Sequence, residues 1–152
     1  MRAMSSPSSQ CSPPSIGLLL RQVRDGFARH LDAAVKDELP ELGFTHLLGL
    51  KVLAERSPCT ANELAHALEQ TPSAITRLLD RLEALGAVKR EPHALDRRAL
   101  QIVMTEQGHA LLQRLMRHGD RVMQFALRDL SPAESAQLTQ LLTRVRDSLN
   151  SP

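Results

Sequence analysis

The sequence predicts a mostly α-helical protein with a small β-hairpin wing, arranged as a winged helix-turn-helix. Three observations carry this prediction: two short capped helices between residues 60 and 86, a charged hairpin directly after them, and long amphipathic helices on both sides. With 152 residues, 42% of them apolar and 24% charged, the chain has the size and composition of one globular domain. We therefore expect one domain over residues 15–152, preceded by a disordered tail over residues 1–14.

The two short helices have clear start and stop signals. Thr60 and Glu63 have the spacing of a capping box, in which hydroxyl and carboxylate satisfy backbone N–H groups reciprocally. Thr71 is a good N-cap before Pro72, and Gly86 ends the second helix. Apolar residues at helical spacing predict the buried face of each helix: Ala61, Leu64, Ala65 and Leu68 in the first, and Ile75, Leu78, Leu79, Leu82 and Leu85 in the second.

The opposite face of the second helix is polar and suits DNA. It carries short hydroxyl side chains that reach phosphate or a base edge, and arginines that fork onto guanine or phosphate. A solvated helix face is the alternative interpretation of the same pattern. The residues of this face are Ser73, Thr76, Arg77, Asp80 and Arg81.

A β-hairpin follows, with strands expected over 87–90 and 99–104. Leu100, Ile102 and Met104 alternate with less apolar residues, as in a half-buried strand. The tip over 91–98 projects Arg97 and Arg98, and an arginine on such a tip reaches into a narrow minor groove. In the alternative interpretation Asp96 simply pairs with Arg98 at the surface, a contact of small energy.

Net charge alone does not identify a nucleic-acid-binding protein. The net charge is +2, and residues 60–104 hold six basic and six acidic side chains. DNA affinity must therefore come from placement, with Arg77, Arg81, Arg97 and Arg98 gathered on one surface.

Four further helices are expected, over 16–39, 45–55, 105–130 and 131–149. The first carries an apolar stripe from Ile16 to Val35, and the last begins with a second capping box at Ser131 and Glu134. The terminal helices offer more apolar surface than a small winged domain covers. A second copy of the chain is the simplest partner for this surface, although packing within one chain must account for part of it.

Residues 16–149 resemble the MarR family of transcriptional regulators (multiple-antibiotic-resistance regulators). Three segments carry the resemblance: 73–86, similar to the family's recognition helix; 86–98, which leads through Asp96-Arg97-Arg98; and 102–108, similar to its strand-to-helix exit. The resemblance implies a homodimer that binds pseudo-palindromic double-stranded operator DNA and usually represses. It implies a winged core over 45–104 and dimerisation helices over 15–39 and 105–149, with Arg98 as the minor-groove arginine. The predicted DNA-binding residues are then Thr71, Ser73, Thr76, Arg77, Arg81, Asp96, Arg97 and Arg98.

The resemblance also implies an effector pocket between the dimerisation helices and the winged core. In the family such pockets often take aromatic carboxylates or phenols, so a small aromatic acid or phenol is the expected effector. Ordinary core and boundary positions are the alternative interpretation of the candidate residues. These candidates are Phe27, His30, Phe44, His46 and Met116.

Other functional classes find little support. We expect neither an enzyme nor a resident cofactor, because nucleophile and phosphate-loop motifs are missing. The six histidines lack metal-ligand spacing, so no metal site is predicted. Cys11 and Cys59 are expected to be reduced, incidental thiols. Residues 1–14 hold five serines and three prolines without an apolar core, and no stretch matches a membrane span, so a cytoplasmic protein is expected.

Two alternatives to a dimeric repressor belong to other classes. One is a winged-helix module whose exposed helix binds a protein. The other is a metal-responsive sensor, which would require stoichiometric metal on the histidines. The position of Arg98 on a wing tip beside Arg77 favours DNA over a protein partner.

Overall fold

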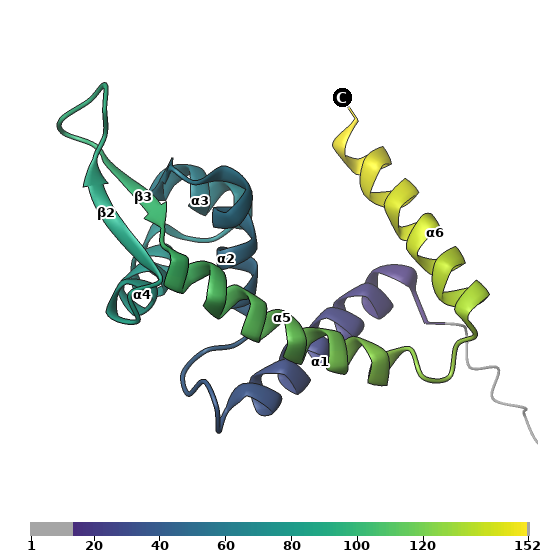
Figure 1. The fold of residues 1–152 in the computed structure, drawn as a ribbon. Helices are drawn as coiled ribbons and strands as arrows, with labels where there is room; N and C mark the ends of the chain where they lie inside the picture. Colours follow the sequence, from purple (N-terminus) through teal and green to yellow (C-terminus); the bar gives the residue numbers. More distant parts are fainter. Residues whose placement is uncertain (1–13, 152) are drawn as a thin grey trace, which may run out of the picture.

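The computed structural model describes residues 14–151, which form six helices and a three-stranded sheet (Figure 1). Most of the predicted tail, residues 1–13, lies outside the described residues. The predicted mostly α fold with a β-hairpin wing is confirmed. The elements are α1 (Ile16–Val35), α2 (Phe44–Arg56), β1 (Cys59–Thr60), α3 (Ala61–Leu68), α4 (Pro72–Ala84), β2 (Val88–Pro92), β3 (Leu100–Met104), α5 (Glu106–Ala126) and α6 (Pro132–Asn150).

The helix-turn-helix pair, α3 and α4, is capped as its sequence predicts. Both halves of the Thr60–Glu63 capping box form, with the backbone N–H of Thr60 donating to the Glu63 carboxylate at 2.6 Å. The Thr71 hydroxyl caps α4 by accepting from the N–H of Ala74 at 3.3 Å. Gly86 ends the helix with a left-handed φ of 69°, which favours glycine. These caps hold the α3–α4 turn in place.

The sheet has the order β1–β3–β2, with both pairs antiparallel. Ile102 of β3 stands between Cys59 of β1 and Arg90 of β2. Strand β2 begins one residue later than predicted and continues to Pro92, and β3 begins at Leu100, so the tip is 93–99 rather than 91–98. The sequence did not predict β1, since two residues are too few to produce an alternating pattern.

The core lies where α2, α3, α4 and the sheet meet α5. Most of the predicted stripe of α4 is buried, as are Ile102 and Met104 of β3. Two predicted core residues are wrong: Leu85 is exposed because it follows the last turn of α4, and Leu100 is exposed because β3 is leaving the core towards the tip. Within the core are Leu31, Val35, Leu50, Leu53, Leu64, Ile75, Leu79, Leu82 and Leu115.

The long helices α1 and α5 pack against each other on one side of this core (Figure 1). Helix α1 ends at Val35 rather than Leu39, because the chain turns there and buries Leu39 and Leu42. Helix α5 ends at Ala126 rather than Leu130, in a turn closed by the N–H of Leu127 on Met123 O. Within 14–151, no helix is long and apolar enough to cross a membrane.

Helix α6 projects away from the rest of the chain (Figure 1), and none of its residues is buried. Its apolar stripe is therefore in solvent, as is the first half of α1. The exposed apolar residues on these two helices are Ile16, Leu18, Leu19, Leu20, Val23, Leu138, Leu141, Leu142, Val145 and Leu149.

Candidate nucleic-acid interface

The start of α4 presents short hydroxyl side chains to solvent. Thr71 and Ser73 lie 3.2 Å apart through their hydroxyl oxygens, and both residues are exposed. Thr76, one turn on, donates its hydroxyl hydrogen to the Pro72 carbonyl at 3.0 Å. The oxygen of Thr76 is left free to accept, and the first turn of α4 carries no acidic residue. This end of the helix is therefore compatible with a phosphate backbone.

Arg77 follows on the same exposed surface of α4. Its guanidinium makes no ion pair with any residue in the described part of the chain. A guanidinium in this state offers all its donors to a ligand.

Arg81, by contrast, points to the loop between α1 and α2. Its Nη2 donates to Pro40 O at 3.1 Å and lies 2.9 Å from the Glu41 carboxylate. The side chain is 32% exposed, and its Nε atom is buried. The sequence places Arg81 among the arginines that face DNA. In the structure its guanidinium instead contacts the Pro40 carbonyl and the Glu41 carboxylate.

The wing tip is shaped by Asp96. Its Oδ1 accepts from the backbone N–H of Arg98 at 3.0 Å, and its carbonyl accepts from Ala99 at 3.1 Å. The N–H of His93 closes the tip on Ala99 O at 2.9 Å. Asp96 therefore forms a local turn with the Arg98 backbone in place of a side-chain ion pair. The guanidinium groups of Arg97 and Arg98 remain exposed, with no ion pair to residues 14–151.

Arg90 of β2 ties the wing to α4. Its Nη2 lies 2.8 Å from Asp80, and its Nη1 pairs with Glu83. The hydrogen bond to Asp80, with the charge of Glu83, raises the pKa of Arg90 above its ordinary value. This bridge fixes the wing relative to α4. Arg77 on α4 and the arginines at the wing tip are therefore held in a constant orientation to each other.

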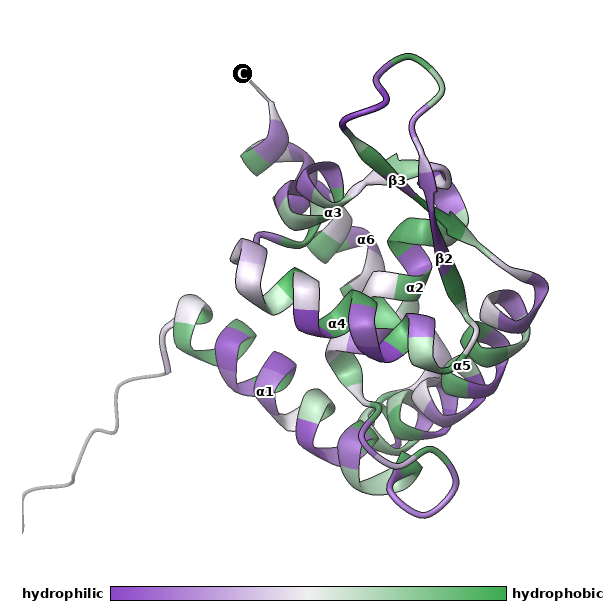
Figure 2. Cartoon of the chain, turned by 90° about the vertical axis from the view of Figure 1, so that its left-hand side faces the viewer, coloured by the Kyte–Doolittle hydropathy of each residue, from purple (hydrophilic) through white to green (hydrophobic). Residues whose placement is uncertain are grey.

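The basic side chains between residues 60 and 104 thus divide into two groups. Three are ion-paired: Arg81, Lys89 and Arg90. The other three, Arg77, Arg97 and Arg98, have no such partner among the residues described and lie on α4 and the wing. Both elements occupy the same end of the molecule (Figure 1), and in Figure 2 the hairpin projects above α4.

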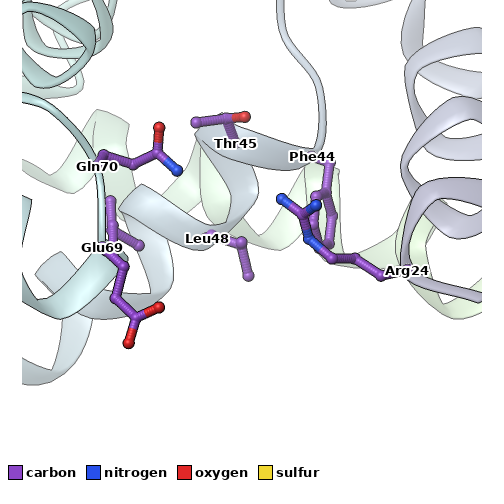
Figure 3. Close-up of a pocket in the computed structure, with 7 residues that line it drawn as sticks. Arg24, Phe44, Thr45, Leu48, Glu69 and Gln70 are labelled. Atoms are coloured by element: carbon purple, nitrogen blue, oxygen red, sulfur yellow. The ribbon is translucent and has the colours of Figure 1, made fainter. Parts of the chain in front are cut away.

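A cleft of about 300 Å³ lies between α1, α2 and the end of α3. In Figure 3, Arg24 of α1 and Phe44 of α2 lie on one side of it and Gln70 lies on the other, with Leu48 and Thr45 of α2 between them. Leu68 and Glu69 complete the lining. The cleft therefore combines apolar walls with one guanidinium, one carboxylate and two uncharged hydrogen-bonding side chains.

The predicted effector residues are only partly brought together. Phe44 lines the cleft, and Phe27 packs edge-on against it with ring centroids 5.6 Å apart. His30 instead lies beside Phe125, at 5.7 Å between rings, and Met116 is an exposed residue of α5. His46 does not line the cleft. Sequence reasoning missed residues such as Arg24 of α1 and Gln70 of the α3–α4 turn, because no local pattern reveals that packing brings them together.

Neither redox nor metal chemistry gains support from the described residues. Burial raises the pKa of the Cys59 thiol, with a further contribution from Glu63, which disfavours the reactive thiolate. Cys11 lies outside the described part. Among residues 14–151 no three His, Cys, Asp or Glu side chains group as metal ligands.

Together, the exposed second helix of a helix-turn-helix and an arginine-tipped hairpin define a winged helix-turn-helix protein. A family model described as the MarR family matches residues 42–99. The transcriptional regulator HosA of Escherichia coli O157:H7 is 28% identical over 127 residues, which are 84% of this chain and 93% of HosA. The reduced form of MarR from E. coli is 26% identical, with a TM-score of 0.80 over 88% of this chain and 98% of MarR. Over its winged core this chain is similar to the MarR family of transcriptional regulators, and its fold matches that of MarR.

A more distant solved structure shares the fold. BpsR of Bordetella bronchiseptica is 21% identical, with a TM-score of 0.72 over 90% of this chain and 99% of BpsR. Regulation of DNA binding by 6-hydroxynicotinic acid is described for BpsR itself.

Proposed function

We propose that the protein is a homodimeric repressor that binds a pseudo-palindromic operator and leaves it when a small aromatic acid or phenol enters the cleft. In this proposal α4 enters the major groove and Arg98 of the wing contacts the minor groove. A related protein of Pseudomonas putida, NicR, is a transcriptional repressor, and a MarR-family protein of Mycobacterium tuberculosis has been solved in complex with DNA.

The observation that carries the proposal is the set of unpaired arginines. Arg77, Arg97 and Arg98 are exposed on α4 and the wing, whereas the neighbouring Arg90 is held by Asp80 and Glu83. Three cations on one end of the molecule, without an ion-pair partner among residues 14–151, favour a polyanionic ligand. The hydroxyl groups of Thr71 and Ser73, at the start of α4, add donor capacity suited to phosphate oxygens.

Dimerisation is supported by the apolar faces of α1 and α6. Isolated surface leucines are normal, but here two helices each expose a continuous stripe. A second copy would cover both stripes and place two recognition helices side by side. The half-sites should then lie about 10 bp apart, centre to centre.

The cleft supports the effector part of the proposal. Phe44, Leu48 and Leu68 suit an aromatic ring, and Arg24 suits a carboxylate. Because α1 and the end of α3 form opposite walls, a ligand between them would change how the winged core sits against the dimerisation helices. The cleft lies on a different surface of the chain from the proposed DNA-binding residues, so an effector would act on DNA binding through this change in packing.

Footprinting on the gene's own upstream region tests the operator part. We expect two protected half-sites about 10 bp apart. Protection of a single asymmetric half-site would contradict a symmetric dimer on DNA.

A release experiment tests the effector part, with 6-hydroxynicotinic acid and 4-hydroxybenzoic acid as probes. At least one of them should release the protein from operator DNA, and Arg24→Ala should raise the required concentration. Arg29→Ala, which removes an arginine of α1 outside the cleft lining, is the matched control and should respond like the wild type. Equal responses of the two variants would remove Arg24 from the site.

A further inference from the structure

Arg81 lies one turn beyond Arg77 on α4, but the two guanidinium groups have different surroundings. Arg77 has no ion-pair partner in 14–151, whereas Arg81 reaches across to the loop between α1 and α2. Both groups that Arg81 contacts, the Pro40 carbonyl and the Glu41 carboxylate, belong to that loop. Arg81 thus links the recognition helix to the segment that joins a dimerisation helix to the winged core.

The loop itself is held on its other side. The Glu38 carboxylate accepts from Arg114 of α5 at 2.9 Å and lies 2.8 Å from Nε2 of His118. These two partners lower the pKa of Glu38, Arg114 first, so the carboxylate stays ionised. Leu39 and Leu42 are buried in the core. A loop fixed in this way can serve as a rigid reference for α4.

The conformation of Glu41 also fits this role. Its φ is 65°, in the left-handed region that non-glycine residues seldom adopt. In this conformation its carboxylate lies 2.9 Å from Nη2 of Arg81. Meanwhile Nε of Arg81 is buried with no hydrogen-bond partner in the described structure. A buried donor without an acceptor costs free energy, so stability alone does not explain the placement of this arginine.

We propose that Arg81 is a positioning residue, which sets the orientation of the recognition helix through Pro40 and Glu41 and does not itself contact DNA. This inference rests on the proposed function, because it assigns how α4 is held against the operator. The orientation of α4 determines whether its side chains meet base edges, so loss of the link should affect specific binding and spare non-specific binding.

The effect of Glu41 separates positioning from contact. If Arg81 bound phosphate, Glu41→Gln would remove a nearby negative charge and leave operator affinity unchanged or raise it. If Arg81 positions α4, Glu41→Gln weakens operator binding, because it breaks the ion pair that holds the arginine. The two roles therefore predict different outcomes for one substitution: weaker operator binding for positioning, and unchanged or tighter binding for phosphate contact.

The test compares the full-length wild type, Glu41→Gln, Arg81→Ala, their double variant and Arg77→Ala. Operator DNA selected from a random pool and a random-sequence duplex are titrated over a salt series. We expect Glu41→Gln and Arg81→Ala each to weaken operator binding about tenfold, with the double variant no weaker than Arg81→Ala. Affinity for the random duplex and the salt slope should match the wild type.

Three results would overturn the inference. The first is that Glu41→Gln binds the operator as tightly as the wild type or more tightly. The second is that Arg81→Ala has a smaller salt slope than the wild type. An equal loss of operator and random-duplex affinity would mean that the variants only lower the folded fraction. Arg77→Ala distinguishes failure of this inference from failure of the proposed function. If Arg77→Ala weakens operator binding while Glu41→Gln does not, only the positioning role of Arg81 is contradicted. If Arg77→Ala also has no effect, the proposed DNA-binding role of α4 fails.

Discussion

Asp32 of α1 caps α2 from outside: its Oδ1 accepts a hydrogen bond from the backbone N–H of Phe44 at 2.9 Å. The N-cap residue of α2 is Gly43, which has no side chain to do this. A Cβ on Gly43 would overlap the Asp32 carboxylate, so the glycine makes room for the remote cap. Asp32→Ala should therefore lower the free energy of unfolding by about 1 kcal/mol. Urea unfolding of both proteins at a fixed protein concentration measures this change in the free energy of unfolding.

Asp120→Ala is the matched control for this prediction. Asp120 is also an exposed helical aspartate, on α5, but it caps nothing in the described chain. Both substitutions change helix propensity alike, so the difference between them isolates the cap. Equal stability of the two variants would show that the Asp32–Phe44 hydrogen bond contributes nothing.

Gly108, in the first turn of α5, lies against the backbone of Ala87, the residue before β2. A Cβ there would overlap the carbonyl oxygen of Ala87, a backbone atom that cannot move aside cheaply. Gly108→Ala should cost about 1–3 kcal/mol of stability. Gly26→Ala, in the interior of α1 with its nearest neighbour 3.8 Å away at Arg29 Nη2, should instead raise stability by about 0.5–1 kcal/mol. Thermal or urea unfolding that gave both changes the same sign would contradict this packing.

Local signals in the sequence predicted the helix-turn-helix well. Thr60, Thr71 and Gly86 specify helix ends through their own hydrogen bonds and backbone angles, and they act as predicted. The partners of Arg81 could not be predicted, because Pro40 and Glu41 lie some forty residues away and no periodic pattern links them. Most of the cleft lining was missed for the same reason, since its walls come from three helices and only Phe44 of the predicted residues lines it.

Dimerisation should depend on the apolar stripe of α6. Light scattering of the wild type at micromolar concentration should give about twice the monomer mass of 16.8 kDa. Leu142→Lys places a charge on the stripe and should shift the mass towards the monomer, because a lysine is costly to bury unpaired. Gln140→Lys, on the polar side of the same helix, should remain dimeric. A monomeric wild type would refute the proposed assembly.

His46 should make stability depend on pH. Burial, with a further contribution from the Arg81 guanidinium, lowers its pKa below the ordinary 6.5, while Asp32 acts in the opposite direction. The unfolded chain therefore binds a proton more readily than the folded one near pH 6. The contribution of His46 is present above about pH 6.5 and is lost as the pH falls through the folded-state pKa.

The measurement for His46 is the change in unfolding free energy between about pH 7.5 and 5.5, a window above the ordinary range of carboxylates. His46→Gln should lose less stability across it than the wild type. His109→Gln, at an exposed position of α5, is the control and should follow the wild type. An unchanged pH dependence in His46→Gln would assign the loss to other groups.

The most direct test of the proposed function is the salt dependence of operator binding for Arg98→Ala and Arg77→Ala, with Lys89→Ala, a lysine paired with Glu91, as control. Arg98→Ala should weaken binding to all sequences and lower the log–log salt slope by about one to two units. Arg77→Ala should cost about 1–3 kcal/mol per half-site and relax preference at one base position. Lys89→Ala should change little. If both arginine variants bound the operator like the wild type while the dimer stayed intact, α4 and the wing would not be the DNA-binding surface.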